Sequence, residues 1–246
     1  MVLSGVSLPF ETNIMQQEDN NMGARIYPIQ LGFDRCYIVQ DKGTIMIDGG
    51  AQGKIKAFMK GIGKLSIRPE LIKLIVLTHG HCDHISSVRD IKEKTGAKIA
   101  IHEKEKEWLE KGLKPMPPGV NLWGRFLCKA FTMCLPLIDV PAAPVDIVIG
   151  NEGLPLAEYG ISGSIIHTPG HSSGSVSVLL DTGDVFVGDM AMNKLPLSLR
   201  PGLPIFAEDF NKLKKSWQTL LDQGVKTIYP SHGKPFPASI IRDLLS

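Results

Sequence analysis

The spacing of apolar residues divides the first quarter of the chain into strands followed by a helix. Segments 24–31, 35–40 and 44–48 are rich in β-branched and aromatic residues, and short polar turns separate them. Such runs predict adjacent antiparallel strands. Over 54–62 the apolar residues instead recur every three or four positions, which predicts an amphipathic helix that ends at Gly63.

Strands and helices alternate through the middle of the chain, and the second half begins again with strands. This order predicts α/β layering, in which two similar halves pack sheet against sheet and the helices lie outside. The predicted strands cover 74–77, 98–101, 146–149, 163–167, 175–180, 184–187 and 227–229, and the predicted helices cover 86–95, 103–111, 210–223 and a last segment that ends at Leu245.

Residues 112–144 interrupt this order with six prolines around one predicted helix, 122–135. We interpret the segment as an insertion. Its apolar side chains, among them Trp123 and Phe131, allow two interpretations. Helical apolar spacing usually indicates ordinary packing, whereas the alternative is a lid over an apolar substrate. The sequence leaves both open.

Length and composition indicate one globular domain that spans 1–246, with an N-terminal extension over 1–22. The chain is 43% apolar and 21% charged, close to ordinary soluble proteins. Its 27 basic and 25 acidic residues give a net charge of +2. This balance creates no strong field, so we expect a small-molecule substrate and no nucleic-acid partner.

The sequence also predicts a cytoplasmic protein. The most apolar stretch, 120–148, is interrupted by charged residues and prolines and predicts no transmembrane segment. Met1–Asn13 lacks the basic start of a secretory signal. The cysteines form no CxxC pair and are expected to be reduced and mostly buried. They are Cys36, Cys82, Cys128 and Cys134.

The segment Thr78–His84, THGHCDH, follows a short apolar strand and carries three imidazoles and a carboxylate. In an extended segment alternate side chains point the same way, so His79 and His81 can face one ion. Asp83 and His84, where the chain turns into a helix, can reach a neighbouring ion. Three imidazoles and a carboxylate in six positions are difficult to explain as packing.

Further ligands are expected from the second half. Each follows an apolar run and lies beside glycine, where the backbone can approach an ion closely. They are His171, Asp189 and His232. Imidazole and carboxylate suit zinc, which we expect first, but also iron or manganese.

These motifs and their order resemble the metallo-β-lactamase fold superfamily, whose signature is HxHxDH followed by single His, Asp and His ligands. The resemblance implies an αββα sandwich of two mixed sheets with helices on both outer faces, and two metal ions per chain. By the resemblance, His79, His81 and His171 hold the first ion, Asp83, His84 and His232 hold the second, and Asp189 bridges them.

Other polar residues are assigned supporting roles or none. Asp48 ends a strand before two glycines and is expected to hydrogen-bond a ligand histidine. Cys82 occupies a position that the family does not use for metal, and is expected to be small and buried. A lone histidine is more often surface or core than ligand, so His102 and His167 are not assigned to the metals.

The expected activity is hydrolysis of an ester-like bond by a metal-bound hydroxide, with Asp83 orienting the hydroxide or carrying a proton. A lactone, thioester or carboxylic ester is favoured, partly because of the apolar insertion. A phosphodiesterase or a β-lactamase of the same fold is the alternative. A non-catalytic metal-binding regulatory module is an alternative of another class, and a homodimer stays open.

Overall fold

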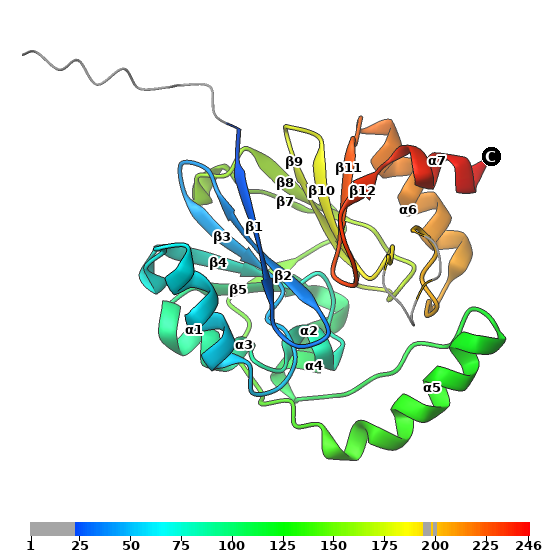
Figure 1. The fold of residues 1–246 in the computed structure, drawn as a ribbon, viewed down its shortest axis with the longest axis horizontal. Helices are drawn as coiled ribbons and strands as arrows, with labels where there is room; N and C mark the ends of the chain where they lie inside the picture. The colour runs from blue at the N-terminus through cyan, green and yellow to red at the C-terminus, as the bar shows by residue number, and fades with distance from the viewer. Residues whose placement is uncertain (1–22, 194–197, 199–200) are drawn as a thin grey trace, which may run out of the picture.

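The computed structural model describes residues 23–193, 198 and 201–246, so the expected N-terminal extension, 1–22, lies outside the described residues. Figure 1 shows two sheets packed face to face, with helices on the outer side of each. This confirms the αββα sandwich. Across the described ranges, every helix is too short or too polar to span a membrane.

The first sheet is built from the first half of the chain. Its strands follow one another in chain order; β1 to β3 pair antiparallel, and β3 to β6 pair parallel. Its strands are β1 (Arg25–Gln30), β2 (Arg35–Gln40), β3 (Thr44–Ile47), β4 (Ile72–Val76), β5 (Lys98–His102) and β6 (Ile147–Ile149).

The second sheet takes the second half, again in chain order. Of its pairs, β10 with β11 is parallel and the others are antiparallel. Its strands are β7 (Leu154–Pro155), β8 (Gly163–His167), β9 (Val176–Leu180), β10 (Asp184–Gly188), β11 (Thr227–Pro230) and β12 (Phe236–Pro237).

The helices cover the outer faces of the two sheets or connect their strands. In Figure 1, α1 and α3 lie against the first sheet, and α6 and α7 lie against the second. The helices are α1 (Ile55–Lys64), α2 (Cys82–Ile85), α3 (Val88–Thr95), α4 (Lys106–Glu110), α5 (Leu122–Cys134), α6 (Phe210–Asp222) and α7 (Ser239–Leu245).

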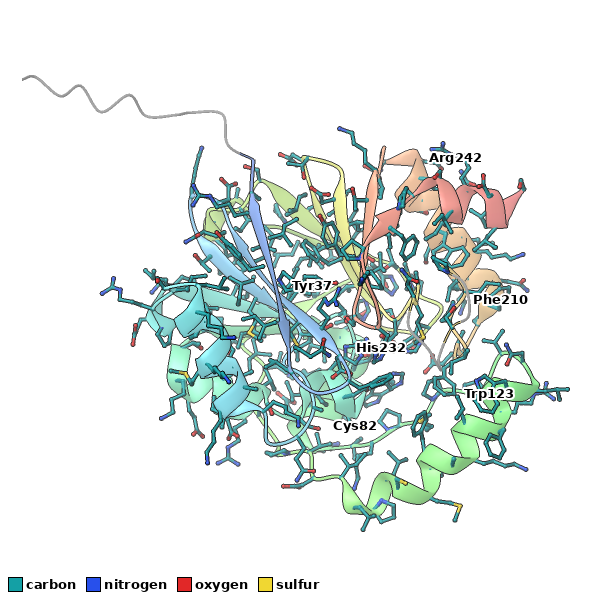
Figure 2. The ribbon with its side chains drawn as sticks, in the orientation of Figure 1. Tyr37, Cys82, Trp123, Phe210, His232 and Arg242 are labelled. Carbon is teal, nitrogen blue, oxygen red and sulfur yellow. The ribbon has the colours of Figure 1, made fainter. Side chains whose placement is uncertain are left out.

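The alternation of side chains along β2 explains why its residues are apolar on both faces. Cys36 and Ile38 pack with α1 and α3, whereas Tyr37 and Val39 pack between the two sheets. A strand that is covered on both sides has no polar face. The Tyr37 hydroxyl donates a 2.7 Å hydrogen bond to the Pro230 carbonyl, which links the sheets near the site (Figure 2).

Three local predictions were wrong. The first helix continues through Gly63 to Lys64, because the turn that ends it uses Ser66, whose φ is 56°. The predicted helix over 86–95 begins two residues later, at Val88, as α3, and a separate single turn, α2, precedes it over Cys82–Ile85. Mostly buried cysteines were also expected, but Cys36 alone is fully buried, and Cys134 is exposed.

Candidate metal centre

The HxHxDH segment, residues 79–84, follows the buried end of β4 and continues into α2, at the edge where the two sheets meet. His81 is still extended, with φ −73° and ψ 150°, and α2 begins at the next residue. His79 and His81 therefore precede the helix, whereas Asp83 and His84 lie within its single turn. The change from strand to helix separates the four side chains into two pairs, as the sequence predicted.

The first of two ligand groups consists of three buried histidines, His79, His81 and His171. Their ligand atoms lie within 4.8 Å of one another. His81 Nδ1 and His171 Nε2 are 3.0 Å apart. Two nitrogens bound to one tetrahedral zinc ion at 2.0–2.1 Å would be about 3.3 Å apart. His81 and His171 therefore already have nearly the spacing that one ion requires.

The second group consists of Asp83, His84, Asp189 and His232, again within 4.8 Å. Asp189 Oδ1 is 3.4 Å from His84 Nε2, and its Oδ2 is 3.2 Å from His232 Nε2. The same Oδ2 is 3.9 Å from His171 Nε2 in the first group. Asp189 thus stands between the two groups, which is the position that the family resemblance implies for a bridging residue.

Hydrogen bonds on the far side of the rings orient two of the ligand histidines. His84 Nδ1 is 2.9 Å from Asp48 Oδ2, and His171 Nδ1 is 3.0 Å from the Phe206 carbonyl oxygen. An acceptor at Nδ1 fixes the proton there and leaves the Nε2 lone pair for a metal. The predicted contact between Asp48 and a ligand histidine is present, and its partner is His84.

Asp48 also joins three segments of the chain at the site. Its carboxylate accepts hydrogen bonds from the Thr78 amide at 2.8 Å and from the Ser231 hydroxyl at 3.0 Å. The residue adopts a left-handed φ of 61°, which turns the chain sharply after β3. One buried carboxylate therefore fixes β3, the HxHxDH segment and the segment that carries His232.

The two groups differ in charge. Burial, together with neighbouring imidazoles, holds the pKa of His79 well below its usual range and lowers that of His81 to about 3. Burial also lowers the pKa of His232, but Asp189 and Asp83 outweigh it and raise the value to about 10. The first group is therefore neutral with free lone pairs, whereas the second balances protonated imidazole against carboxylate.

The site fits metal ions, because it contains buried polar atoms without hydrogen-bond partners. Nε2 of His79 and Nε2 of His84 are both buried and make no hydrogen bond. Burying such groups unpaired is costly. Nitrogen and carboxylate ligands that converge in this way suit two cations. Cys82 belongs to neither group and is partly exposed, which corrects the expectation that it is buried.

His102 and His167 also lie outside both groups. Their rings stack on each other, with centroids 4.2 Å apart. Leaving them out of the predicted ligand set is consistent with this arrangement.

Two acidic residues at the site were missed by sequence reasoning. Asp34 is fully buried between β1 and β2, and its Oδ1 lies 3.7 Å from His232 Nδ1. Glu105 accepts hydrogen bonds from the amides of Gly80, at 2.5 Å, and Gly174, at 2.8 Å. It thereby holds the HxHxDH segment against the segment that follows His171. Neither residue lies in a motif, and the local sequence resembles a polar turn and a charged helix.

An apolar cavity of ≈ 520 Å³ opens onto both ligand groups. His81, Asp83 and His232 line it on the metal side. The opposite side is formed by the Pro-rich segment and α5, through Met116 and Phe131 among others. Figure 2 shows Cys82 and His232 on the side of the sandwich that faces α5.

The sequence matches the family model of the metallo-beta-lactamase superfamily over residues 31–232. The chain therefore belongs to that superfamily. With two convergent ligand groups in place, it is a metal-dependent hydrolase of that superfamily.

Individual relatives share less than a third of the aligned residues with this chain. The probable metallo-hydrolase YqgX of Bacillus subtilis is 29% identical over 166 residues, which are 66% of this chain and 67% of that protein. The hydroxyacylglutathione hydrolase GloC of Haemophilus influenzae is 28% identical over 173 residues, 69% of this chain and 72% of its own.

Solved structures share the fold at lower identity. The B3 metallo-beta-lactamase BLEG-1 has a TM-score of 0.66 at 24% identity, over 89% of this chain and 97% of that one. TTHA1623 in a di-iron-bound form has a TM-score of 0.59 at 23% identity, over 87% and 96%.

Proposed function

We propose that this hydrolase cleaves a thioester, lactone or carboxylic ester whose acyl group occupies the apolar cavity. The observation that carries the proposal is the position of that cavity. Its metal-side wall contains Asp83 and His232, and its opposite wall contains Phe131 and Leu135. A carbonyl group beside the ligand groups would therefore have its acyl chain against apolar side chains, away from water.

We assign the seven ligands as the sequence did. Zinc is the metal we propose first, although iron and manganese accept the same donors, and the relative TTHA1623 has been seen with two irons. The first ion is assigned to His79, His81 and His171, the second to Asp83, His84 and His232, and Asp189 to the position between them.

When bound, two ions would supply an activated water molecule at neutral pH and positive charge beside the substrate carbonyl oxygen. The chain's own residues prepare the site for this. Burial keeps the His79 and His81 imidazoles neutral, and hydrogen bonds through Asp48 and Phe206 hold two further rings in place. The apolar cavity wall excludes water from the acyl side.

Asp83 is the residue to which we assign proton transfer. It belongs to the second group, yet its side chain is 38% exposed and lines the cavity. Because the side chain borders the cavity in which the substrate would lie, it can pass a proton toward a leaving group. Asp83→Asn should lower kcat far more than it raises KM at unchanged metal content. An unchanged kcat in fully loaded protein would remove this role.

A hydrolysis screen tests the substrate class. Metal-loaded protein should cleave acyl thioesters, lactones or aryl esters faster than a bis-aryl phosphodiester or a chromogenic β-lactam. The relative GloC is a hydroxyacylglutathione hydrolase, which favours including thioesters. Preference for the phosphodiester or the β-lactam would overturn the substrate class. No hydrolysis of any of these substrates by protein incubated with metal would favour the regulatory module.

Two phenylalanines of α5 provide a test variant and a control variant for the acyl specificity. Phe131 lines the cavity, whereas Phe126, on the same helix, does not. Phe131→Ala should raise KM for octanoyl esters several-fold more than for acetyl esters, and Phe126→Ala should leave the ratio unchanged. Equal effects on both chain lengths would mean that α5 only packs.

A cytoplasmic location also stays part of the proposal, in keeping with four free cysteines.

A further inference from the structure

The helix α5 is apolar on two opposite faces. On its inner face Phe131 lines the cavity. On its outer face Leu122, Phe126 and Met133 follow one another at helical spacing and are 83%, 61% and 81% exposed. Of its thirteen residues only Gly124 is buried. A helix that merely completes a core would carry mostly polar residues on its outer face, whereas three large apolar side chains lie on this one.

The inner contacts of α5 fix which face points outward. Gly124 packs so closely on the Ile205 carbonyl that a Cβ there would lie 2.4 Å from its oxygen. The rings of Phe131 and Phe206 meet edge to face, with centroids 6.1 Å apart. The Asn121 side chain caps the start of the helix by accepting a hydrogen bond from the Gly124 amide. The outer apolar residues are therefore held away from the protein body.

The charged side chains on and around α5 are all basic. Residues 112–138 contain Lys114, Arg125 and Lys129 but no Asp or Glu, although the whole chain is nearly balanced. Arg125 and Lys129 are exposed. At 100° per residue, Lys129 lies on the same face as Phe126 and Met133. Trp123, also exposed, stacks on Phe126 with ring centroids 5.5 Å apart.

We propose that α5 docks the enzyme on the surface of a bilayer that contains anionic phospholipids. An interfacial helix of this kind buries Trp, Phe and Leu at the acyl boundary while Lys and Arg meet lipid phosphates. Figures 1 and 2 show α5 outside the sandwich, with Trp123 on it. A second copy fits less well, because a twofold interface would place the same basic patch opposite itself.

Docking through the outer face would place the bilayer one helix diameter, about 10–12 Å, from the cavity on the inner face. An apolar acyl group could then pass from lipid to cavity over a short path. This consequence rests on the proposed function. The docking itself does not, and vesicle binding measures it without any hydrolysis assay.

The test is co-sedimentation of the metal-loaded full chain with vesicles of phosphatidylcholine alone or mixed with phosphatidylglycerol. We expect binding to the mixed vesicles that weakens as salt rises. The double variant F126S/M133S should bind at least tenfold more weakly, because two apolar side chains no longer enter the bilayer. Lys129→Glu should also bind the mixed vesicles at least tenfold more weakly.

The matched control is the double variant M59S/L71S, which removes two exposed apolar side chains away from α5. It should bind vesicles like the wild type, and circular dichroism should show all variants folded. Absence of wild-type sedimentation, or equal binding by F126S/M133S, would overturn the proposal. So would a wild-type dimer that F126S/M133S converts to a monomer in analytical ultracentrifugation without any vesicle binding.

Discussion

Replacing Asp48 by Asn should weaken binding of one metal ion and spare the other. The substitution keeps the size of the side chain, and Asn tolerates the left-handed φ of 61° better than most residues. The Asn oxygen can still accept the 2.8 Å hydrogen bond from the Thr78 amide. What changes is Oδ2, which becomes an amide nitrogen that cannot accept from His84 Nδ1. The Ser231 hydroxyl, which also donates to Oδ2, can rotate and accept from that nitrogen instead.

The size of the loss in metal affinity follows from the hydrogen bond between Asp48 and His84. His84 Nδ1 lies 2.9 Å from Asp48 Oδ2, and both groups are buried. A hydrogen bond to a charged group contributes about 1.5–3 kcal/mol. If His84 instead accepts from the new amide, its proton moves to Nε2, the atom that faces Asp189. Metal affinity in the second group should therefore fall about 10- to 100-fold.

The assay is a competition titration with a chromophoric chelator, which resolves two dissociation constants. We expect the constant for the second group, which contains His84, to rise by that factor, and the constant for His79, His81 and His171 to change less than threefold. Asp41→Asn is the control, because Asp41 is only partly buried and accepts a hydrogen bond from the Ser162 hydroxyl far from the site. Two unchanged constants, or two constants that rise equally, would refute the assignment of His84 and its orientation by Asp48.

Three further predictions concern stability. Glu105→Gln should lower the free energy of unfolding by about 1–3 kcal/mol in urea titrations, because an amide cannot accept from both Gly80 and Gly174; an unchanged midpoint would argue against the bridge. Burial, with His167 and Lys104 nearby, lowers the pKa of His102 to about 4, below its unfolded value. Stability should therefore fall as pH drops from 6.5 to 4, by up to about 3 kcal/mol more in the wild type than in His102→Gln; parallel pH profiles would contradict this. Gly170→Ala should cost more than about 2 kcal/mol, because φ is 143° and the new Cβ would lie 2.3 Å from the Leu213 amide nitrogen; a near-native midpoint would show that the segment can shift.

Most of the fold could be predicted from the spacing of apolar residues. Strands such as β2 are apolar on both faces because each lies between a helix layer and the other sheet, and such runs are easily recognised. The strands β7 and β12 were missed because each has two residues, too few to show a period. The end of α1 was misplaced because Ser66, rather than a glycine, adopts the left-handed turn.

The metal ligands of the candidate site could be predicted, but the buried acidic residues that support them could not. HxHxDH concentrates four donors in six positions, and the structure brings His171, Asp189 and His232 to it. Glu105 carries no such signal, because its contact with Gly174 spans 69 residues. Asp34 lies in an ordinary hairpin turn, and only the folded chain places it beside His232.

Anomalous diffraction from crystals of the metal-loaded protein tests the central claim most directly. Two peaks are expected, each about 2.0–2.2 Å from its ligand atoms. One should lie among His79, His81 and His171, the other among Asp83, His84 and His232, with Asp189 touching both. A single peak in the loaded protein would contradict the account. So would protein that shows no peak at either group after chelation but still hydrolyses esters.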